Sequence, residues 1–400
     1  LPLGFAPFHL PGMAIIGMAF FYYFLCHKEG SNGFLAGIFF GLGYFGFGIS
    51  WVYVSIHEYG HLHPIIAALA TFSFIFYLSL FTALFAYIFI RLSQKKITFL
   101  STLIFSASWI LVEYLRSKLF TGFPWLLLGF GQFDSPIKFL LPILGVYGGS
   151  FFTCLAAGLL VQSIVQQRYL RYKFIFPFMF ILLSPLLIQS VHWVNEEKKP
   201  IHIGIVQANL SMRDKWDEAL FWQLLDTYEK DIVQLLGTDM IVLPESAIPL
   251  PASYISDVLQ DLNAKALKAG SSILLGIPKP STLHDDQYYN ALISLGAAKG
   301  DYVKQHLVPF GEYIPAFFQP LMEKLNIPDT NLKAGLSSQR LVKVHHHPIA
   351  TVICYELAYG ELLRQQFPSA EWIVSISDDG WFGHSFAMYQ QQQIAQVRSL

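Results

Sequence analysis

Charged side chains are scarce in this 400-residue chain. Asp, Glu, Lys and Arg make up only 13% of it, whereas 54% is hydrophobic and 16% aromatic. Soluble domains usually carry about 25% charged residues, so the composition indicates a protein that meets a lipid bilayer. The formal net charge is −1, which gives no sign of a nucleic-acid partner.

Cysteine is almost as rare, with three residues in the chain. Cys26 and Cys154 lie in long apolar runs, where we expect them to act as small buried hydrophobic residues. Cys354 is the one cysteine of the more polar second half, so that half has no internal disulfide partner for it. A free thiol on the oxidising side of a membrane is a liability, which favours a chemical role for Cys354.

The scarcity of charge is concentrated in the first half, where apolar runs dominate from Leu1 to about Val194. A helix needs about 20 apolar residues to cross the hydrocarbon core. We therefore expect a transmembrane bundle over residues 1–194, with an earlier span missing at the N-terminus. About six spans are expected, near residues 10–26, 34–56, 65–90, 99–115, 141–165 and 174–194.

Two patterns within these runs predict local packing. Near the end of the fourth run, Glu113 and Arg116 are three positions apart and can pair at a helix end. The alternative is interfacial anchoring, with Trp125 among the lipid headgroups and Arg116 extended towards water. The second run contains glycines that would give a span a small-residue face for close helix packing: Gly41, Gly43, Gly46 and Gly48.

Basic residues in the connections predict the orientation, because loops rich in Lys and Arg stay in the cytoplasm. One set of alternate loops holds seven Lys and Arg residues. The other set holds none over residues 57–64 and three in the longer loop that follows. Everything after Val194 is therefore expected outside the cytoplasm. The basic set comprises Lys28, Arg91, Lys95, Lys96, Arg168, Arg171 and Lys173, and the other set Arg116, Lys118 and Lys138.

From Asn195 onward the charge density is that of an ordinary globular domain, so we expect a catalytic domain over residues 195–400, cut short at its C-terminal end. Strand-like and helix-like segments alternate, which predicts a layered α/β domain with mixed sheets. The expected strands are 201–206, 240–243, 272–277, 291–295, 302–304, 349–353 and 372–376. The expected helices are 214–236, 254–269 and 361–367.

Three expected strands end in reactive side chains: Glu245, Lys304 and Cys354. Strand exits are where α/β folds collect catalytic groups. A base makes a thiol nucleophilic by removing its proton, and Glu245 in a partly apolar pocket would suit that task. Lys304 would stabilise the oxyanion formed when the thiolate attacks a carbonyl. Singly, a Glu or Lys beside a strand is usually a surface residue; the set of three favours a catalytic site.

The surroundings of these residues resemble the nitrilase superfamily, and their combination with an apolar first half resembles the apolipoprotein N-acyltransferase family. The matching segments extend over nearly the whole chain, and Pro309–Tyr313 and Cys354–Glu356 are the specific ones. The segments are Ala6–Phe8, Trp51–Ser55, Gly122–Trp125, Lys215-Trp216, Leu243–Glu245, His306–Tyr313, Ile353–Glu356 and Asp379–Gly383.

The resemblance implies a nitrilase-type α-β-β-α sandwich on the extracytoplasmic side of a membrane α-helical bundle. It implies Glu245 as general base, Lys304 as oxyanion stabiliser and Cys354 as nucleophile, with neither a metal nor another cofactor. The implied partners are a phospholipid acyl donor, a diacylglyceryl-modified lipoprotein acceptor and the membrane, and no nucleic acid. Supporting or substrate-binding roles are implied for Glu312, Tyr355, Glu356, Trp216 and Trp381.

The implied reaction is the last step of lipoprotein maturation in the bacterial inner membrane, with the catalytic domain facing the periplasm. An acyl chain moves from phosphatidylethanolamine to Cys354 as a thioester, and then to the α-amino group of the N-terminal diacylglyceryl-cysteine. At about 0.8 kcal/mol per CH₂, moving a two-chain phospholipid into water would cost more than roughly 20 kcal/mol. Such an enzyme must meet its donor in the bilayer, through an apolar cleft that also shelters the thioester.

The chain departs from the family pattern at four positions. The family usually has Asn at Asp378, Gly-Pro at Ala387 and Met388, and His at Gln391. We expect these positions to line the loop after the fifth strand and to alter the preference for lipid or lipoprotein.

Two other functions are compatible with the sequence. A membrane-tethered nitrilase-type amidase would use the same three residues to hydrolyse a small amide, with water as the acceptor, and would favour a small closed pocket. A transporter or scaffold would use its outer domain only for binding. The apolar runs lack the network of ionisable residues that marks a transport path.

Overall fold

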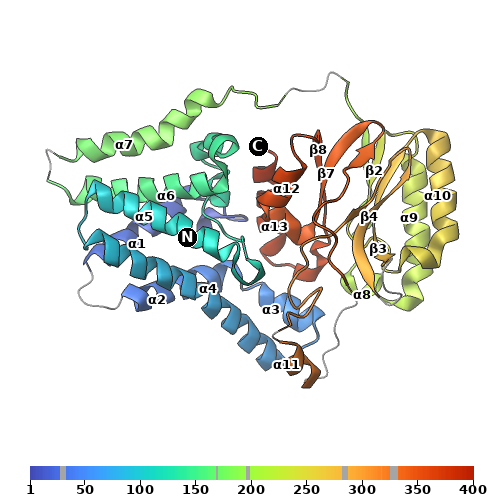
Figure 1. Ribbon diagram of the computed structural model, residues 1–400, viewed down its shortest axis with the longest axis horizontal. Helices are drawn as coiled ribbons and strands as arrows, with labels where there is room; N and C mark the ends of the chain where they lie inside the picture. Colours follow the sequence, from blue (N-terminus) through green and yellow to red (C-terminus); the bar gives the residue numbers. More distant parts are fainter. Residues whose placement is uncertain (28–32, 168–169, 195–198, 282–286, 317, 325–331) are drawn as a thin grey trace. The chain divides into compact units, whose positions relative to one another are not determined.

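The computed structural model describes residues 1–27, 33–167, 170–194, 199–281, 287–316, 318–324 and 332–400. The chain forms two compact units (Figure 1): Leu1–Asn195 with Phe382–Leu400, and Glu196–Trp381. The sequence predicts a division after residue 194, and the structure differs from it in one respect: Phe382–Leu400 belong to the helical unit. Asn195 at the expected boundary, and Lys28 and Arg168 of the orientation argument, lie outside the described residues.

Helices lie in all six apolar ranges. Three described helices are long and apolar enough to cross a membrane, or four if two helices joined by a 62° bend, Gly33–Gly48 and Val52–Tyr59, are one span. The number of crossings therefore stays a prediction. The helices of this unit are α1 (Pro11–His27), α2 (Gly33–Gly48), α3 (Val52–Val54, continued by a π-helical turn over Ser55–Tyr59), α4 (Pro64–Ser93), α5 (Phe99–Arg116), α6 (Leu141–Val165), α7 (Tyr172–Leu183) and α13 (Ala387–Arg398).

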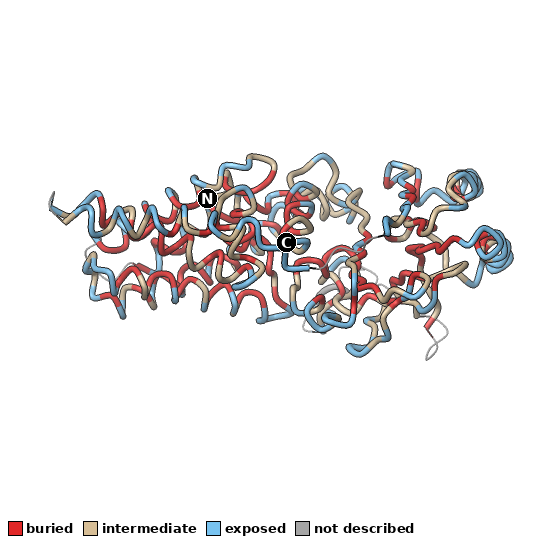
Figure 2. Tube along the Cα trace, turned by 90° about the horizontal axis from the view of Figure 1, so that it is seen from above, coloured by how far each residue is buried: buried red, intermediate tan, exposed pale blue. Residues whose placement is uncertain are grey.

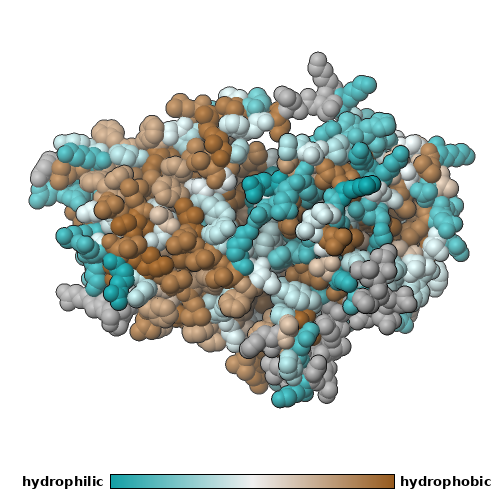
Figure 3. Space-filling view, in the orientation of Figure 1, coloured by the Kyte–Doolittle hydropathy of each residue, from teal (hydrophilic) through white to brown (hydrophobic). Residues whose placement is uncertain are grey.

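The surface of the helical unit is apolar. Figure 3 shows hydrophobic side chains over much of its visible face, and large aromatic residues such as Phe20, Phe39 and Phe72 are more than half exposed. Water would be a poor solvent for an apolar surface of this extent. The unit is therefore built for a lipid environment.

Helices α2 and α4 pack closely because small residues line part of their contact. A side-chain carbon added at Gly41 would lie 2.2 Å from Oγ1 of Thr82, and one at Gly48 would lie 2.3 Å from Leu126. The same carbon at Gly43 or Gly46 would meet nothing within 4 Å. The expected helix-packing face is thus confirmed for Gly41, whereas Gly48 packs against a residue of the loop after α5, and the expectation is wrong for the other two.

Glu113 and Arg116 are buried, each with 2% of its surface exposed. Arg116 donates to the carbonyl oxygen of Trp125 at 2.6 Å, and Glu113 accepts from the backbone N–H of Leu128 at 2.9 Å. Trp125 is itself 2% exposed. The expectation of interfacial anchoring is therefore wrong: both charged groups bind the backbone of the loop after α5, whose carbonyl and N–H groups need buried partners.

The buried side-chain amide of Gln390 attaches helix α13 to the rest of the helical unit. The side-chain oxygen of Gln390 accepts from the indole N–H groups of Trp51 (3.2 Å) and Trp125 (2.7 Å), and its nitrogen donates to the carbonyl of Gly48 (3.0 Å). Three of the four departures from the family pattern lie in this helix, not in a loop as expected: Ala387, Met388 and Gln391.

The other unit contains two mixed sheets, as the sequence predicts. Within the described residues, the first sheet has the order β1-β2-β3-β4-β5 and the second β6-β7-β8. Pairs β1–β2, β2–β3 and β7–β8 are parallel and the others antiparallel. The strands are β1 (Ile203–Ile205), β2 (Met240–Val242), β3 (Ser272–Pro280), β4 (Tyr288–Gly296), β5 (Tyr302–Val303), β6 (Val342–Val344), β7 (His347–Ile353) and β8 (Trp372–Ile376).

Helices cover the outer faces of the sheets and complete the α-β-β-α sandwich (Figure 1). Leu224 of α9 and Leu262 of α10 share a core with Ile273 of β3, and the outer turns of both helices stay exposed (Figure 2). The helix expected over 214–236 is interrupted because Asp217 caps a new turn by accepting from the N–H of Ala219. The helices are α8 (Met212–Lys215), α9 (Phe221–Leu235), α10 (Ser256–Ala269), α11 (Gln319–Lys324) and α12 (Gly360–Gln366).

Candidate active site

The ends of three strands carry the three reactive residues expected from the sequence. Glu245 follows β2, Lys304 follows β5 and Cys354 follows β7. Cys354 begins a short 3-10 turn and has a φ of 55°. Side chains with a β-carbon rarely adopt this left-handed conformation, and such strain is often found at functional positions.

A buried ammonium group joins two carboxylates. Nζ of Lys304, which is 1% exposed, lies 3.3 Å from Oε1 of Glu245 and 2.9 Å from Oε1 of Glu312. Burial alone would lower the pKa of Lys304, but the charges of Glu245 and Glu312 outweigh it and raise the pKa well above its usual value. Lys304 is therefore a fixed cation between two acids, and Glu312 lies where a supporting acid could hold it; its role in catalysis stays a prediction.

Asn290 of β4 orients the same two carboxylates. Its side-chain N–H₂ donates to Oε1 of Glu245 at 2.7 Å and to Oε1 of Glu312 at 2.9 Å. The second oxygen of Glu245 accepts from the backbone N–H of Asp378 at 2.9 Å. The oxygens of Glu245 thus meet N–H donors where the sequence predicts partly apolar surroundings, and Asn290 is a site residue that sequence reasoning missed.

The thiol of Cys354 is buried among opposing charges. Burial raises its pKa well above the usual value, the charge of Glu245 raises it further, and Lys304 and a hydrogen bond with Ser377 lower it. The resting thiol is therefore protonated at neutral pH and needs a base. Glu245 is the carboxylate with the largest electrostatic effect on it.

Glu356 connects the ends of the two sheets. Its carboxylate accepts from the backbone N–H groups of Ile353 (2.8 Å), Gln305 (2.7 Å) and His306 (3.0 Å) and from the hydroxyl of Tyr302. Burial raises the pKa of Glu356 to about 7, although the N–H donors and Lys304 act in the opposite direction. Glu356 thereby fixes the backbone beside both Lys304 and Cys354.

Comparison with known proteins identifies the family. Residues 1–159 match the apolipoprotein N-acyltransferase N-terminal domain, and residues 202–400 match carbon-nitrogen hydrolases. A protein of Methylococcus capsulatus named apolipoprotein N-acyltransferase is 33% identical over 405 residues, which cover 100% of this chain and 80% of the relative. The chain belongs to the apolipoprotein N-acyltransferase family.

A second relative agrees with this assignment. A Coxiella burnetii protein of the same name is 35% identical over 407 residues, covering 100% of this chain and 83% of the relative. A crystal structure of a carbon-nitrogen hydrolase from Helicobacter pylori G27 has a TM-score of 0.33 and 17% identity over 49% of this chain and 66% of that one.

In this member of the acyltransferase family, the aromatic residues that the resemblance implies form two groups. The hydroxyl of Tyr359 donates to that of Tyr355 at 2.9 Å, within and just after the turn that begins at Cys354. Trp216 and Trp381 lie with ring centroids 6.4 Å apart and are 48% and 40% exposed. The tryptophans therefore offer apolar surface next to Lys215 and the Asp378 segment.

Asp378, the remaining departure from the family pattern, makes a buried ion pair with Lys215. This partner is 163 residues away in the sequence. Asp378 lies in a loop as expected, directly after β8, and its carboxylate is directed to a cation inside the unit. Its effect on substrate preference stays a prediction.

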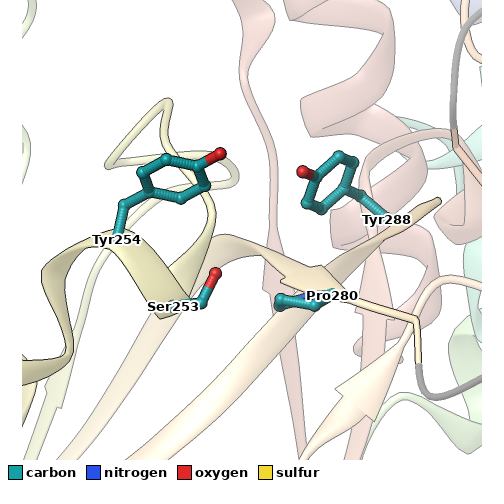
Figure 4. A pocket seen from close by; sticks show the side chains of 4 residues that line it. All are labelled: Ser253, Tyr254, Pro280 and Tyr288. Carbon is teal, nitrogen blue, oxygen red and sulfur yellow. The ribbon is translucent and has the colours of Figure 1, made fainter. Parts of the chain in front are cut away.

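A cavity of about 330 Å³ lies at the end of the first sheet that also carries Glu245. Figure 4 shows the rings of Tyr254 and Tyr288 on opposite sides, with their hydroxyl groups turned towards one another above Ser253. Tyr288 precedes Asn290 by two positions on β4, about 7 Å along the strand and on the same face. Among the described residues, the lining also includes Pro280 but no carboxylate, imidazole or amine, so Glu245, Lys304 and Cys354 lie outside this cavity.

The donor groups of the described residues decide whether the site could hold a metal ion. In this part of the chain, no group of three or more His, Cys, Asp and Glu side chains is arranged to hold a metal ion. The acids of the site instead meet Lys304, Lys215 and N–H donors.

Proposed function

We propose that the chain transfers an acyl chain from a phospholipid to the α-amino group of an N-terminal diacylglyceryl-cysteine, through a thioester on Cys354. The observation that carries the proposal is the electrostatic coupling of the Cys354 thiol to Glu245 and to Lys304, a buried ammonium held by Glu245 and Glu312. The names of the relatives support this acceptor class and favour transfer over amide hydrolysis.

In the first half-reaction, Glu245 takes the proton of the Cys354 thiol, and the sulfur attacks the ester carbonyl of the donor. A C–S bond forms while Lys304 stabilises the negative charge that develops on the carbonyl oxygen. The ester C–O bond then breaks, and the lysophospholipid alcohol leaves with the proton held by Glu245. The product is an acyl thioester on Cys354.

In the second half-reaction, the α-amino group of the acceptor attacks the thioester carbonyl. A C–N bond forms, the amine gives a proton to Glu245, and the C–S bond breaks. The proton returns to the sulfur, which restores the resting site. Glu312 and Asn290 keep their hydrogen bonds to Lys304 and Glu245 throughout, so both half-reactions use one fixed geometry.

The donor proposed is phosphatidylethanolamine, and the location proposed is the bacterial inner membrane with the α/β unit facing the periplasm. The apolar helices support a membrane protein. The basic residues Arg91, Lys95 and Lys96 after α4 support a cytoplasmic location for that connection.

The test is intact-mass analysis and peptide mapping of the protein purified from membranes and incubated with phosphatidylethanolamine. An acyl adduct on Cys354 that hydroxylamine removes is expected, and it should be absent from Glu245→Gln. Cys154→Ala is the matched control, because this buried cysteine lies in α6, and it should keep the adduct.

Addition of a diacylglyceryl-cysteine peptide should discharge the adduct and yield an N-acyl peptide with loss of the thioester. Release of free fatty acid in its place would support the hydrolase alternative. Absence of any adduct on Cys354 under these conditions would contradict the proposed function.

A further inference from the structure

Lys215 and Asp378 form a charged pair inside the α/β unit that the proposed reaction does not use. Lys215 is 6% exposed, and the side chain of Asp378 is 14% exposed. Nζ of Lys215 donates to the carboxylate of Asp378 and, at 3.2 Å, to the carbonyl oxygen of Glu245. A buried charge is tolerated only when it has a partner. Loss of Lys215 would therefore leave Asp378 as an unpaired anion, whereas loss of the Asp378 charge leaves Lys215 bound to the carbonyl oxygen of Glu245.

Asp378 contacts both the proposed base, Glu245, and Lys215. Its backbone N–H donates to Oε2 of Glu245 at 2.9 Å, while its carboxylate accepts from Lys215 and, at 3.2 Å, from the N–H of Gly380. A hydrogen bond from this N–H therefore brings a second carboxylate next to Glu245. Without a cation, that carboxylate would favour protonated Glu245 and weaken it as a base.

The same segment reaches the nucleophile. Ser377 makes a hydrogen bond with the thiol of Cys354 and donates to Oδ1 of Asp379 at 2.7 Å. Residues 377–379 thus contact both reacting side chains, and Lys215 binds this segment from α8. Close packing supports the contact, since a side-chain carbon at Gly380 would lie 2.8 Å from Met212 of α8.

We propose that Lys215 is a positioning residue that neutralises Asp378, so that the Asp378 N–H holds Glu245 without its carboxylate acting on the base. This inference rests on the proposed role of Glu245. The charged or titratable groups around Glu245 are Lys304 after β5, Glu312 in the following loop, Cys354 after β7, Asp378 and Asp379 after β8, and Lys215 of α8.

The test measures alkylation of Cys354 by iodoacetamide against pH, with peptide mapping to separate it from Cys26 and Cys154. This reaction reports thiolate formation and needs no acyl donor. We expect Lys215→Met to slow alkylation at neutral pH about tenfold or more, since one partner of a buried pair is lost. Its acid limb should move to higher pH, because an unpaired anion then lies beside the base.

Removal of the second charge distinguishes neutralisation from simple packing. Lys215→Met combined with Asp378→Asn should return the rate to within about threefold of the wild type and restore the acid limb, because neither charge is then unpaired. Asp378→Asn alone should stay close to the wild type. The matched control is Lys230→Met, which removes the cation of an exposed ion pair with Asp226 and should leave the profile unchanged.

Two outcomes would overturn the inference, because a packing role predicts both. One is a double variant whose alkylation is as slow as that of Lys215→Met, and the other is slower alkylation of Lys215→Met with no shift of its acid limb. If Lys215→Met does not fold, the double variant is compared with Asp378→Asn. Equal profiles are expected, and a tenfold slower double variant would refute the inference. The proposed function fails separately, through absence of an acyl adduct in the wild type.

Discussion

Cys354 experiences two opposing charges, and their balance explains why the site needs a base. The anionic Glu245 raises the pKa of the thiol, whereas the cationic Lys304 lowers it. Glu245 thus opposes thiolate formation as long as it is ionised, and it favours it only by accepting the proton. The same carboxylate therefore has two separable effects on one sulfur atom.

Replacing Glu245 by Gln should separate these effects. Acyl-thioester formation at neutral pH should fall by about 100-fold or more, which is the usual contribution of a general base. The alkaline rise in alkylation of Cys354 should nevertheless shift to lower pH, since the charge that raises the thiol pKa is gone. A shift to higher pH would contradict the assigned electrostatics; rates of both reactions are measured on the same preparation.

Sequence reasoning finds the residues that stand at strand ends and misses those that act across the fold. Glu245, Lys304 and Cys354 each follow a run of β-formers, so a local pattern indicates them. Asn290 lies inside β4, where nothing local distinguishes it from any other strand residue. The pair Lys215–Asp378 is likewise invisible, because its members meet only after the chain has formed both sheets.

Among the elements, the turn after β7 depends on a carboxylate whose ionisation is opposed by burial. The pKa of Glu356 rises from 4.5 to about 7 in the folded protein. A raised carboxyl pKa contributes stability that is complete below pH 4.5 and is lost as the pH rises through about 7. A shift of this size corresponds to about 3 kcal/mol.

Comparison with Glu356→Gln should reveal this dependence. We expect the variant to have a lower free energy of unfolding at low pH, because its amide nitrogen replaces an oxygen that accepts hydrogen bonds. This difference from the wild type should narrow between pH 4.5 and 7, since only the wild type ionises and loses stability there. Thermal unfolding of the full chain in detergent, followed by tryptophan fluorescence, measures the difference. Glu361→Gln, an exposed position on α12, is the control; a deficit that widens with pH would give Glu356 the opposite sign.

The close contact of α2 with α4 predicts unequal effects of equal substitutions. Gly41→Ala should destabilise the helical unit by about 1–3 kcal/mol, because the added carbon overlaps Thr82 and Ser79. Gly43→Ala meets open space and should be neutral or slightly stabilising, since Ala is the better helix former. Equal melting temperatures for the two variants would mean that this contact is looser than described.

Sequence patterns predict best those elements whose formation depends on their own residues and least on contacts with distant parts of the chain. The apolar ranges coincide with helices because a 20-residue apolar run has few alternatives. The helix expected over 214–236 was interrupted because its polar start contains a cap at Asp217. Strand β6 was missed because Lys343 and the nearby polar residues on both sides leave no apolar run of the kind that marks β2. The membership of α13 in the helical unit depends on Gln390, a polar residue whose partners lie more than 250 positions away.

At the scale of the whole molecule, the orientation prediction is open to a direct measurement. Alkaline phosphatase fused after Pro200 should be active, since it would be exported, whereas a fusion after Lys96 should be inactive. Immunoblots of both fusions control for expression. Activity of the Lys96 fusion with an inactive Pro200 fusion would reverse the proposed topology.

The return of the chain to the helical unit at Phe382 makes the α/β unit an insertion with two covalent tethers. A domain on one tether is released by a single break, but this one has a connection at each end. A protease that cuts once between Val194 and Ile201 would leave the nicked protein joined through Trp381 and Phe382. Release of the α/β unit from the helical unit therefore takes two cuts, and a single nick leaves the effective concentration of one unit for the other unchanged.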